Sequence, residues 1–389
     1  MASKNQKLPV PVPVAGVRRD FDALAMPAEG LEHGQNVIVR RGVLVPRACN
    51  EAMNWFSGDE WGLLYGTSTA TAIAYEAANT RHVLARSDGN LVVTDDEFAT
   101  TENHTFHGGV SGSYTYFIKI IHDATNNRWI GLDVNGSIWT AVEAWPDSGQ
   151  WTRYLNGNDG AAVDMVHDVT SGTTIALLSV GGAEQPSIYW STNGTTWTVV
   201  GYSRYGHSLY GDSEIGYGGH SKPNDYFYLK TRKDANTDYL LAIIVGEIDN
   251  AGIDFDEYET GTHRVDFCGG GNNTLCIYDD GEDNWIQRST NSGDTWTTVL
   301  GAGLAYTGDR FKRLFYDSTL GYLLLGGDNY RSLDAADWTQ YPDLSFGTES
   351  IIDAISDGTD WYIVSDAGVW KFPSNDDDTV ETIVSMYQF

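Results

Sequence analysis

Long apolar runs, cysteines and signal-like segments are all scarce in this 389-residue chain. No stretch approaches the 18 apolar residues that a membrane-spanning helix needs, so we expect no transmembrane segment. The opening MASKNQK-LPVPVPVAG is too short and too rich in proline for the apolar core of a secretory signal. Only Cys49, Cys268 and Cys276 occur, a number and spacing that indicate neither a disulfide framework nor a metal site. Cys268 and Cys276 could face each other across a hairpin, but the sequence favours two reduced thiols in the core.

Basic residues are also few, and their distribution is uneven. The chain has 24 Lys and Arg against 53 Asp and Glu, for a formal net charge of −29. Non-specific binding to nucleic acid or to anionic membranes needs an excess of Lys and Arg, so this composition argues against both. Residues 1–47 nevertheless carry seven basic and four acidic residues, net +3, which leaves net −32 for the rest. A basic arm on an acidic body predicts that the arm docks on something acidic, such as a neighbouring copy.

Helical periodicity is largely missing, and turn-forming and aromatic residues are abundant. The one helical candidate is residues 27–36, where Pro27 suits a first helical turn. The chain has 43 glycines and is 12% aromatic, which favours many short strands joined by turns.

A repeat of 40–50 residues organises the chain. Each copy has an apolar run, a Gly/Asp turn, a second strand with an aromatic residue, a polar loop and a third strand, with an alternating run upstream. Five clear copies cover residues 127–154, 173–200, 273–299, 321–341 and 359–384, and weaker ones cover 73–98 and 225–247. When the upstream run is counted as the first strand of a unit, the apolar run is its second strand. This second strand is expected to start near residues 83, 129, 175, 226, 275, 322 and 361.

This period matches the four-stranded blade of a β-propeller. We therefore predict an all-β fold, a propeller of seven four-stranded blades over residues 51–389, behind an extended N-terminal arm and docking segment over residues 1–50. The strand that closes the ring is expected from residues 379–389 or from residues 35–47.

Three hairpins share a polar motif that ends in tryptophan. The stretch STNSGDTW (289–296) resembles the Asp box, or BNR repeat, of sialidases and other propellers, whose general form is Ser-x-Asp/Asn-x-Gly-x-Thr-Trp. A second copy is one residue shorter and a third lacks the glycine. The residues assigned to the motif are Ser191, Asn193, Gly194, Trp197, Ser289, Asn291, Gly293, Trp296, Ser332, Asp334 and Trp338. We expect a structural role, in which Asn or Asp bonds downstream amides, Gly takes a positive φ and Trp fills the wedge between blades.

The Asp-box resemblance does not extend to sialidase chemistry. Sialidases carry an early Arg-Ile-Pro motif and an arginine triad for the substrate carboxylate, and this chain has no Arg-Ile-Pro string. No carboxylate pair stands out among the 53 acidic residues as a glycosidase acid and nucleophile. We therefore predict that the protein is not an enzyme and nominate no catalytic residue.

Metal-type clusters are weak in this sequence. His104 and His107 lie three apart but lack a third ligand. The acidic stretch 247–259 lacks the order of an EF-hand loop, and residues 374–379 are expected to be a solvated loop. We expect no metal and no cofactor.

The N-terminal segment has a pattern of its own. Its alternating Pro-Val run is extended and stiff. The stretch after that run resembles the opening of bacteriophage tail proteins, notably the nozzle-type proteins of the podophage tail tube. The matching positions are Gly16, Pro27, Gly30, Gly34, Asn36, Gly42, Leu44 and Arg47. The resemblance implies a β-propeller protein that assembles as a ring of six below a portal and adaptor.

From this resemblance we predict a structural virion protein, a tail nozzle or hub that forms a ring-shaped conduit for DNA ejection. We expect the protein to bind copies of itself in a ring, which is a hexamer in the family pattern. Its other expected partners are the portal, the adaptor and other tail proteins. DNA is expected to pass without specific binding, and no membrane is expected. The arginines expected to support assembly are Arg18, Arg19, Arg40, Arg41 and Arg47. An acidic body suits a conduit because it repels phosphate. The alternative is a carbohydrate-binding or receptor-recognition propeller, and after it a sialidase-like glycoside hydrolase.

Overall fold

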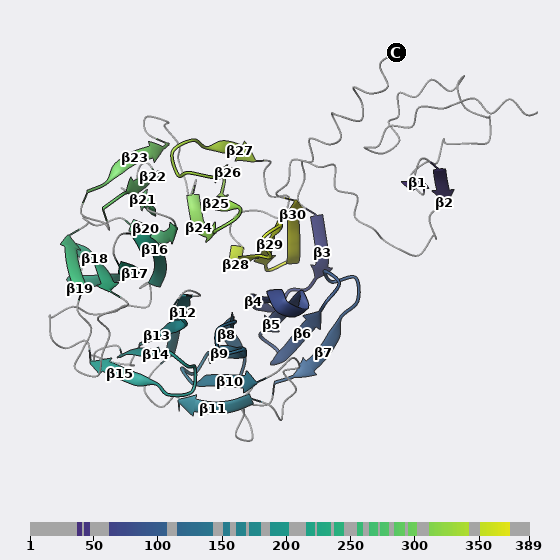
Figure 1. Cartoon of the computed structure of the whole chain (residues 1–389), viewed down its shortest axis with the longest axis horizontal. Helices are drawn as coiled ribbons and strands as arrows, with labels where there is room; N and C mark the ends of the chain where they lie inside the picture. The colour runs from purple at the N-terminus through teal and green to yellow at the C-terminus, as the bar shows by residue number, and fades with distance from the viewer. Residues whose placement is uncertain are drawn as a thin grey trace, which may run out of the picture. The chain divides into compact units, whose positions relative to one another are not determined.

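The computed structural model describes residues 37–40, 43–46, 62–106, 115–142, 151–155, 161–168, 171–179, 187–201, 215–221, 224–234, 237–244, 255–259, 264–270, 273–279, 284–291, 295–301, 311–341 and 351–373. Most of these residues lie in strands that form antiparallel sheets arranged radially around a common centre (Figure 1). The protein is thus an all-β propeller, as the repeat predicted. Among the described residues, no helix has the length and apolar character that crossing a membrane requires.

The first three sheets are four-stranded meanders, in which each strand bonds to the next along the chain. Blade A consists of β4 (Ala70–Glu76), β5 (Arg81–Arg86), β6 (Asn90–Thr94) and β7 (Glu102–Thr105), with a short 3-10 turn, η3 (Ala77–Asn79), after β4. Blade B consists of β8 (Phe117–Asp123), β9 (Arg128–Asp133), β10 (Ile138–Val142) and β11 (Trp151–Leu155). Blade C consists of β12 (Ala161–Asp168), β13 (Thr173–Ser179), β14 (Ser187–Ser191) and β15 (Thr198–Gly201).

Of the remaining three sheets, blade E is again a four-stranded meander, whereas blade D is larger and blade F takes one strand from a distant part of the chain. Blade D is eight-stranded and contains β16 (Ile215–Ser221), β17 (Asn224–Asp234), β18 (Thr237–Ile244), β19 (Phe255–Glu259), β20 (Arg264–Gly270), β21 (Asn273–Asp279), β22 (Asn284–Ser289) and β23 (Thr297–Leu300). Blade E contains β24 (Phe311–Asp317), β25 (Gly321–Gly326), β26 (Asn329–Ser332) and β27 (Thr339–Tyr341). Blade F contains β28 (Ile351–Ser356), β29 (Asp360–Ser365), β30 (Gly368–Pro373) and, from the other end of the propeller sequence, β3 (Gly62–Gly66).

The predicted number of seven separate blades is wrong, because the described strands of the propeller form six sheets. All seven expected second strands are present, and they begin within two residues of the predicted positions, at Arg81, Arg128, Thr173, Asn224, Asn273, Gly321 and Asp360. The fourth and fifth repeats, however, merge into blade D. A parallel bridge joins Gly218 of β16 to Gly269 of β20. Both positions lack a side chain, which lets two inner strands approach closely enough to share a sheet.

The predicted closing segment is also wrong. The fourth strand of blade F is β3, which lies beside β30 in the sheet. Residues 35–47 instead contain β1 (Val37–Arg40) and β2 (Val43–Pro46), which pair with each other in a separate hairpin. Residues 379–389 lie outside the described ranges. Because β3 has only five residues, with glycine at each end, its sequence gives a weak strand signal.

By its own packing the chain divides into residues 63–374, which hold the propeller, and a second unit of residues 1–62 with 375–389. The predicted domain boundary at residue 50 falls among residues 47–61, outside the described ranges, and stays a prediction. The expected helix over 27–36 lies outside them as well.

The hydrophobic core lies mainly at the seams between blades. One cluster joins blade A to blade B and includes Phe106, Phe117 and Trp129, while another joins blade B to blade C. A third joins blade D to blade E, and a fourth joins blade F to blade A through side chains that include Leu84 and Tyr362. Each of these four seams therefore buries apolar surface contributed by two sheets, which fixes the neighbouring blades to one another.

The two described cysteines, Cys268 and Cys276, are buried free thiols. In the register of β20 and β21, Cys268 lies opposite Leu275 and Cys276 lies opposite Phe267. Opposed residues share a face and adjacent residues alternate, so the two thiols point to opposite faces of the sheet. This register agrees with reduced core thiols and disagrees with a facing pair.

Candidate functional site

The segments that resemble the Asp box occupy the same place in three meanders. Ser191, Ser289 and Ser332 each end a third strand (β14, β22 and β26). Trp197, Trp296 and Trp338 each directly precede a fourth strand (β15, β23 and β27). The motif therefore lies on outer hairpins, remote in the fold from the inner strands. Gly293 lies outside the described residues.

Local hydrogen bonds hold the hairpin around Asn193. Its Oδ1 accepts from the amide N–H of Thr195 at 2.9 Å and from that of Thr196 at 2.8 Å, while Ser191 Oγ accepts from the N–H of Gly194 at 2.8 Å. Gly194 has φ +69°, and a Cβ there would meet Arg128 and Ile130 of blade B at 2.9 Å. The loop thus packs on the preceding blade, and Trp197 adds to the apolar cluster that blades B and C share.

The other two hairpins repeat part of this bonding. Asn291 Oδ1 accepts from the N–H of Thr295 at 2.9 Å, and Asp334 Oδ1 accepts from the N–H of Ala336 at 2.8 Å and of Asp337 at 3.0 Å. These contacts are those of turns tightened by an Asx side chain. The identification of the three hairpins as Asp boxes rests on the sequence pattern alone.

We expect the substitution Asn193→Ala to lower the free energy of unfolding by about 1–2 kcal/mol, because two backbone amides lose their acceptor. Urea unfolding followed by tryptophan fluorescence would measure it. Asn193→Asp is the matched control, since a carboxylate keeps the acceptor oxygen, and its effect should stay within about 0.5 kcal/mol. An alanine variant as stable as the aspartate variant would contradict a fastening role.

Several other residues of the predicted sites lie wholly or partly outside the described residues. Arg18, Arg19, Arg41 and Arg47 are outside the described residues, and for Arg40, the last residue of β1, only the backbone is described. His107, residues 374–379 and residues 247–254 are also outside them, while residues 255–259 form β19.

His104, one half of the histidine pair in the sequence, lies on β7. Its Nε2 is 3.5 Å from Glu102 Oε2, so a carboxylate of the same strand faces the ring.

A ring of charged residues on the inner strands was not predicted. Blade D contains two of the repeats, so the propeller has seven first strands. Each of them has a β-bulge in its pairing with the second strand. In five of the seven, the residue on the C-terminal side of the bulge is charged. These residues are Lys119, Asp164, Asp266, Arg313 and Asp353. Figure 1 shows that the strands which carry them surround the centre of the propeller.

Two of the carboxylates link neighbouring blades. Asp353 Oδ2 accepts from the N–H of Ile73 at 3.2 Å, which joins blade F to blade A, and Asp266 Oδ2 accepts from the N–H of Leu314 at 2.7 Å, which joins blade D to blade E. Bulges re-aim side chains. Here the bulge places a carboxylate against a backbone donor of the next blade, so each link bridges two sheets.

Lys119 extends the network past one whole blade. Its Nζ donates to Asp353 Oδ1 at 2.7 Å, so blade B is joined to blade F beside the inner strand of blade A. Burial would lower the pKa of Lys119, but the Asp353 and Asp164 carboxylates outweigh it and raise that pKa. Burial raises the pKa of Asp164, and the Lys119 ammonium opposes the rise. Lys119 is therefore held as a cation at the centre, where it can bind carboxylates and not act as a base.

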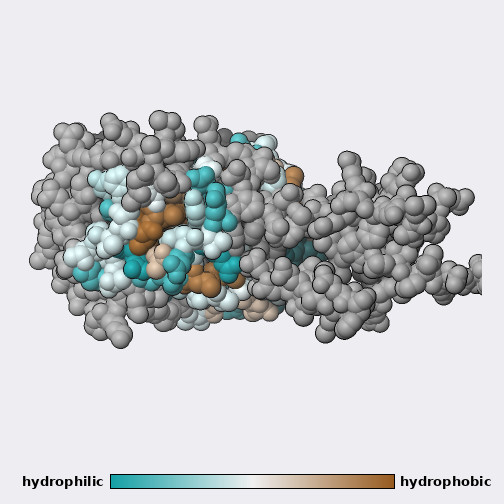
Figure 2. Space-filling view, turned by 90° about the horizontal axis from the view of Figure 1, so that it is seen from above, coloured by the Kyte–Doolittle hydropathy of each residue, from teal (hydrophilic) through white to brown (hydrophobic). Residues whose placement is uncertain are grey.

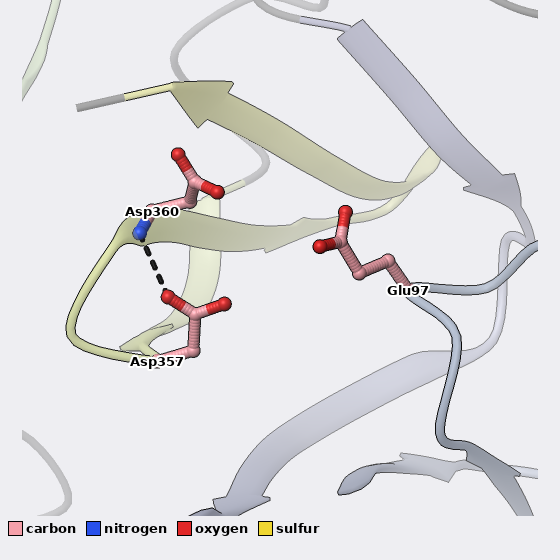
Figure 3. Close-up of side chains that lie close together, drawn as sticks. All are labelled: Glu97, Asp357 and Asp360. Atoms are coloured by element: carbon pink, nitrogen blue, oxygen red, sulfur yellow. Dashed lines mark hydrogen bonds between the residues drawn. The ribbon is translucent and has the colours of Figure 1, made fainter. Parts of the chain in front are cut away.

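A second group of charges lies at the seam between blades F and A (Figure 3). The carboxylates of Glu97, Asp357 and Asp360 offer oxygens that all lie within 4.8 Å of one another. Asp357 Oδ1 accepts from the Asp360 N–H at 2.7 Å. Glu97 reaches them from the turn between β6 and β7, where it has φ 57° and Phe98 has φ 68°. Left-handed backbone at two successive non-glycine residues costs energy, and Thr94 Oγ1 steadies the turn by accepting from the N–H of Phe98 at 3.0 Å.

Three carboxylates can in principle hold a divalent cation. The protein's own cation already lies among these, because Lys371 Nζ is 2.5 Å from Glu97 Oε2 and 2.8 Å from Asp360 Oδ2. Burial would lower the pKa of Lys371, but its bonds to Asp360 and Glu97 raise it. The cluster is thus a latch between two blades in which Lys371 links carboxylates of both, and we assign no metal to it.

Large apolar side chains are exposed at only a few described positions, namely Val142, Tyr154, Val199 and Leu333. On the coloured part of the face in Figure 2, apolar groups are small and bordered by hydrophilic ones. No docking surface is assigned from them.

Comparison with known proteins bears on the fold. No family model matches the chain, and no curated protein matches it. Among solved structures, one described as YCF48 bound to D1 peptide has a TM-score of 0.59 at 14% identity, over 84% of this chain and 99% of that one. A streptogramin B lyase has a TM-score of 0.55 at 12% identity, and the match covers 80% of this chain and 96% of that one. PorZ, a surface component of the type-IX secretion system of Porphyromonas gingivalis, has a TM-score of 0.51 at 14% identity, and the match covers 80% of this chain and 37% of that one.

The shared feature is the β-propeller. At these identities the likeness shows the fold alone, because propellers host unrelated functions.

Neither the charged ring nor the seam latch was found from the sequence. A signal for the ring does exist, since FIKIIHD, AAVDMVHD, FKRLFYD and IIDAISD all place a charge inside an apolar inner strand. Aligning the repeats on their inner strands, in place of their tryptophans, would have shown it.

Proposed function

We propose that the protein is a ring-forming structural component of a bacteriophage tail, of the nozzle or hub class, whose propeller is a rigid module and whose residues 1–50 are the docking segment. The observation that carries the proposal is how the propeller closes. Its last blade is completed by β3, which begins at Gly62, so no described strand from residues 1–61 is part of a propeller sheet. Since the described strands of the segment that resembles phage tail proteins take no part in closure, we assign that segment to assembly.

Charge supports the same proposal. Residues 1–47 carry net +3 and the remainder carries net −32, so the arm of one copy is attracted to the body of the next. An acidic body also repels DNA, which suits a passage through which DNA moves without binding.

The charged ring bears on where DNA would pass. The Lys119–Asp353 pair, together with Asp164, holds charged side chains at the centre of the propeller. Because these side chains occupy the centre of each propeller, the proposal places the DNA path elsewhere. DNA passes through the centre of a ring of copies, six in the family pattern, and each propeller contributes part of the wall.

Deletion of residues 1–20 tests the proposal. We expect the full chain to form closed rings in negative-stain electron microscopy and mass photometry, and the deletion variant to remain monomeric with an unchanged melting temperature. A matched variant with Arg18 and Arg19 replaced by glutamate should weaken assembly through charge alone. In tailed particles from the source culture, an antibody against this chain should label the tail.

Two outcomes would overturn the proposal. One is a full chain that stays monomeric at high concentration together with no label on any particle. The other is a monomer that binds a glycan saturably and loses binding when an exposed aromatic residue is replaced, which would favour the receptor-recognition alternative.

A further inference from the structure

Three buried histidines lie at three successive seams of the propeller. His82 is on β5 of blade A, His122 is the next-to-last residue of β8 in blade B, and His167 is the next-to-last residue of β12 in blade C. The side chains of His122 and His167 are each 5% exposed, and His82 as a whole residue is 1% exposed. At the matching position of β24, blade E carries Tyr316.

His82 lies in an aromatic box at the seam that closes the ring. Its ring centroid is 4.3 Å from that of Tyr362 on blade F, 4.7 Å from that of Tyr75 and 5.8 Å from that of Phe98. Neither ring nitrogen has a hydrogen-bond partner. The charged groups that face it are Asp357 and Lys371, both on blade F.

Asp357 is poorly placed to receive a second cation. Its Oδ2 accepts from the Tyr362 hydroxyl at 3.0 Å, and its Oδ1 accepts from the N–H of Thr359 and of Asp360 at 2.7 Å each. An imidazolium at position 82 would have two N–H donors without an acceptor, beside the Lys371 ammonium. Leaving buried charged donors unpaired is costly.

The other two histidines each face a carboxylate of the preceding blade. His122 Nε2 is 3.9 Å from Glu76 Oε1, which Arg81 already engages at 2.9 Å through the other oxygen. The His122 ring also faces Asp123, Arg81 and Asn127, and it lies 4.8 Å from the ring of Trp129.

His167 repeats this arrangement at the next seam. Its Nε2 is 3.8 Å from Asp123 Oδ1, and its Nδ1 lies 2.9 Å from Thr174 Oγ1. Asp168 and His122 are the other titratable groups that face it. Asp123 and Asp168 both hold turns of their own, through Asn126 and Ser171.

We propose that His82, His122 and His167 form an acid-sensitive switch, in which protonation loosens the F–A, A–B and B–C seams, beginning with His82 at the closing F–A seam. The device is built into the fold and does not depend on the tail function proposed above. It converts a fall in pH into a release of blade F from blade A, where the ring of sheets is joined by β3.

The direction of the switch is set by the pKa values. Burial lowers the pKa of His82 from 6.5 to about 4, against the opposing pull of Asp357. Burial also lowers the pKa of His122 and of His167, against the pull of Glu76 and of Asp123 respectively. Below pH 6.5 the unfolded chain binds protons that the folded chain excludes. Stability is therefore full above that pH and falls as the pH drops from 6.5 toward 4.

Urea unfolding of the wild type and of His82→Phe across pH 7.5 to 5.0 tests the switch. Phenylalanine fits an aromatic box and does not titrate, so the ratio of the two unfolding constants isolates His82 from the general titration of an acidic protein. We expect this ratio to change roughly 30-fold between pH 7.5 and 5.0, as the pKa difference dictates. His104→Asn is the control, since His104 is partly exposed beside Glu102, and its ratio to the wild type should change less than about threefold.

Hydrogen exchange measured by mass spectrometry locates the effect. Peptides from β3, β30 and β4 should lose protection at pH 5.0, after correction for intrinsic rates, while peptides from β24 to β27 of blade E should not. Should His82→Phe fail to fold, His82→Gln provides a second non-titrating variant. A ratio that stays constant with pH, or an equal loss of protection in blade E, would overturn the proposal.

Discussion

Replacing Gly368 by alanine is expected to detach the strand that closes the propeller. Gly368 begins β30 with φ +143°, a conformation that residues with a side chain rarely adopt. A Cβ there would lie 2.0 Å from the carbonyl oxygen of Tyr65 and 3.0 Å from Cα of Gly66, both on β3. Backbone atoms cannot rotate away as a flexible side chain would. We therefore expect β3 to be displaced, at a cost of about 3–5 kcal/mol in the free energy of unfolding.

Gly358 provides the matched control. It also has a positive φ, +87°, but a Cβ there would meet nothing within 4 Å. Gly358→Ala should therefore cost only the backbone strain, about 1 kcal/mol. Urea unfolding compares the two variants, and limited proteolysis of the segment around residues 62–66 reports whether β3 is released. Equal stability of the two variants, or an unchanged cleavage pattern in Gly368→Ala, would show that β3 does not close the ring through this contact.

The positions of the second strands could be predicted because their signal is local. GYLLLG and DWYIVS, for example, are apolar runs that are buried at every position. Residues at such strands are chosen by burial alone, so the pattern repeats in every unit and can be read without knowing which sheets adjoin.

The merging of two repeats and the choice of closing strand could not be predicted, because both depend on contacts between distant segments. The bridge of Gly218 to Gly269 joins residues about fifty positions apart, and β3 pairs with a strand some three hundred positions away. GLLYG has no feature that distinguishes it from a loop until β30 lies beside it.

The charged groups of the centre and of the seam could not be predicted for the same reason, because their contacts join distant segments. The tryptophan motif is a local turn, and its hydrogen bonds run between residues two to four apart. Asp353 acts on Ile73 and Lys119, and Lys371 acts on Glu97, across separations of more than two hundred residues. Among 53 acidic residues nothing local distinguishes these carboxylates from solvated ones, so only the fold reveals them.

Removal of the Asp353 carboxylate is expected to loosen both the centre and the closing seam. Asp353 is 4% exposed, and its two oxygens serve two elements, the N–H of Ile73 on blade A and Nζ of Lys119 on blade B. Asp353→Ala leaves a buried amide unpaired and a cation near Arg313 without its main partner. Lys119 is 29% exposed, so water recovers part of that loss. We expect a decrease of about 2–3 kcal/mol in the free energy of unfolding.

The charge and the hydrogen bond can be separated with a second variant. Asp353→Asn keeps an oxygen that can accept from the Ile73 N–H but removes the negative charge, so it reports the ion pair alone. Combined with Lys119→Met in a double-mutant cycle, it should give a coupling energy of about 1–2 kcal/mol. Asp366→Ala is the control, because Asp366 is exposed and should change stability by less than about 0.5 kcal/mol. If Asp353→Ala were no more harmful than Asp366→Ala, the ring of charges would be a solvated feature of the centre and not a link between blades. A large loss in Asp353→Ala with little coupling to Lys119 would instead place the stabilisation in the bond to blade A, which joins the first and last sheets of the ring.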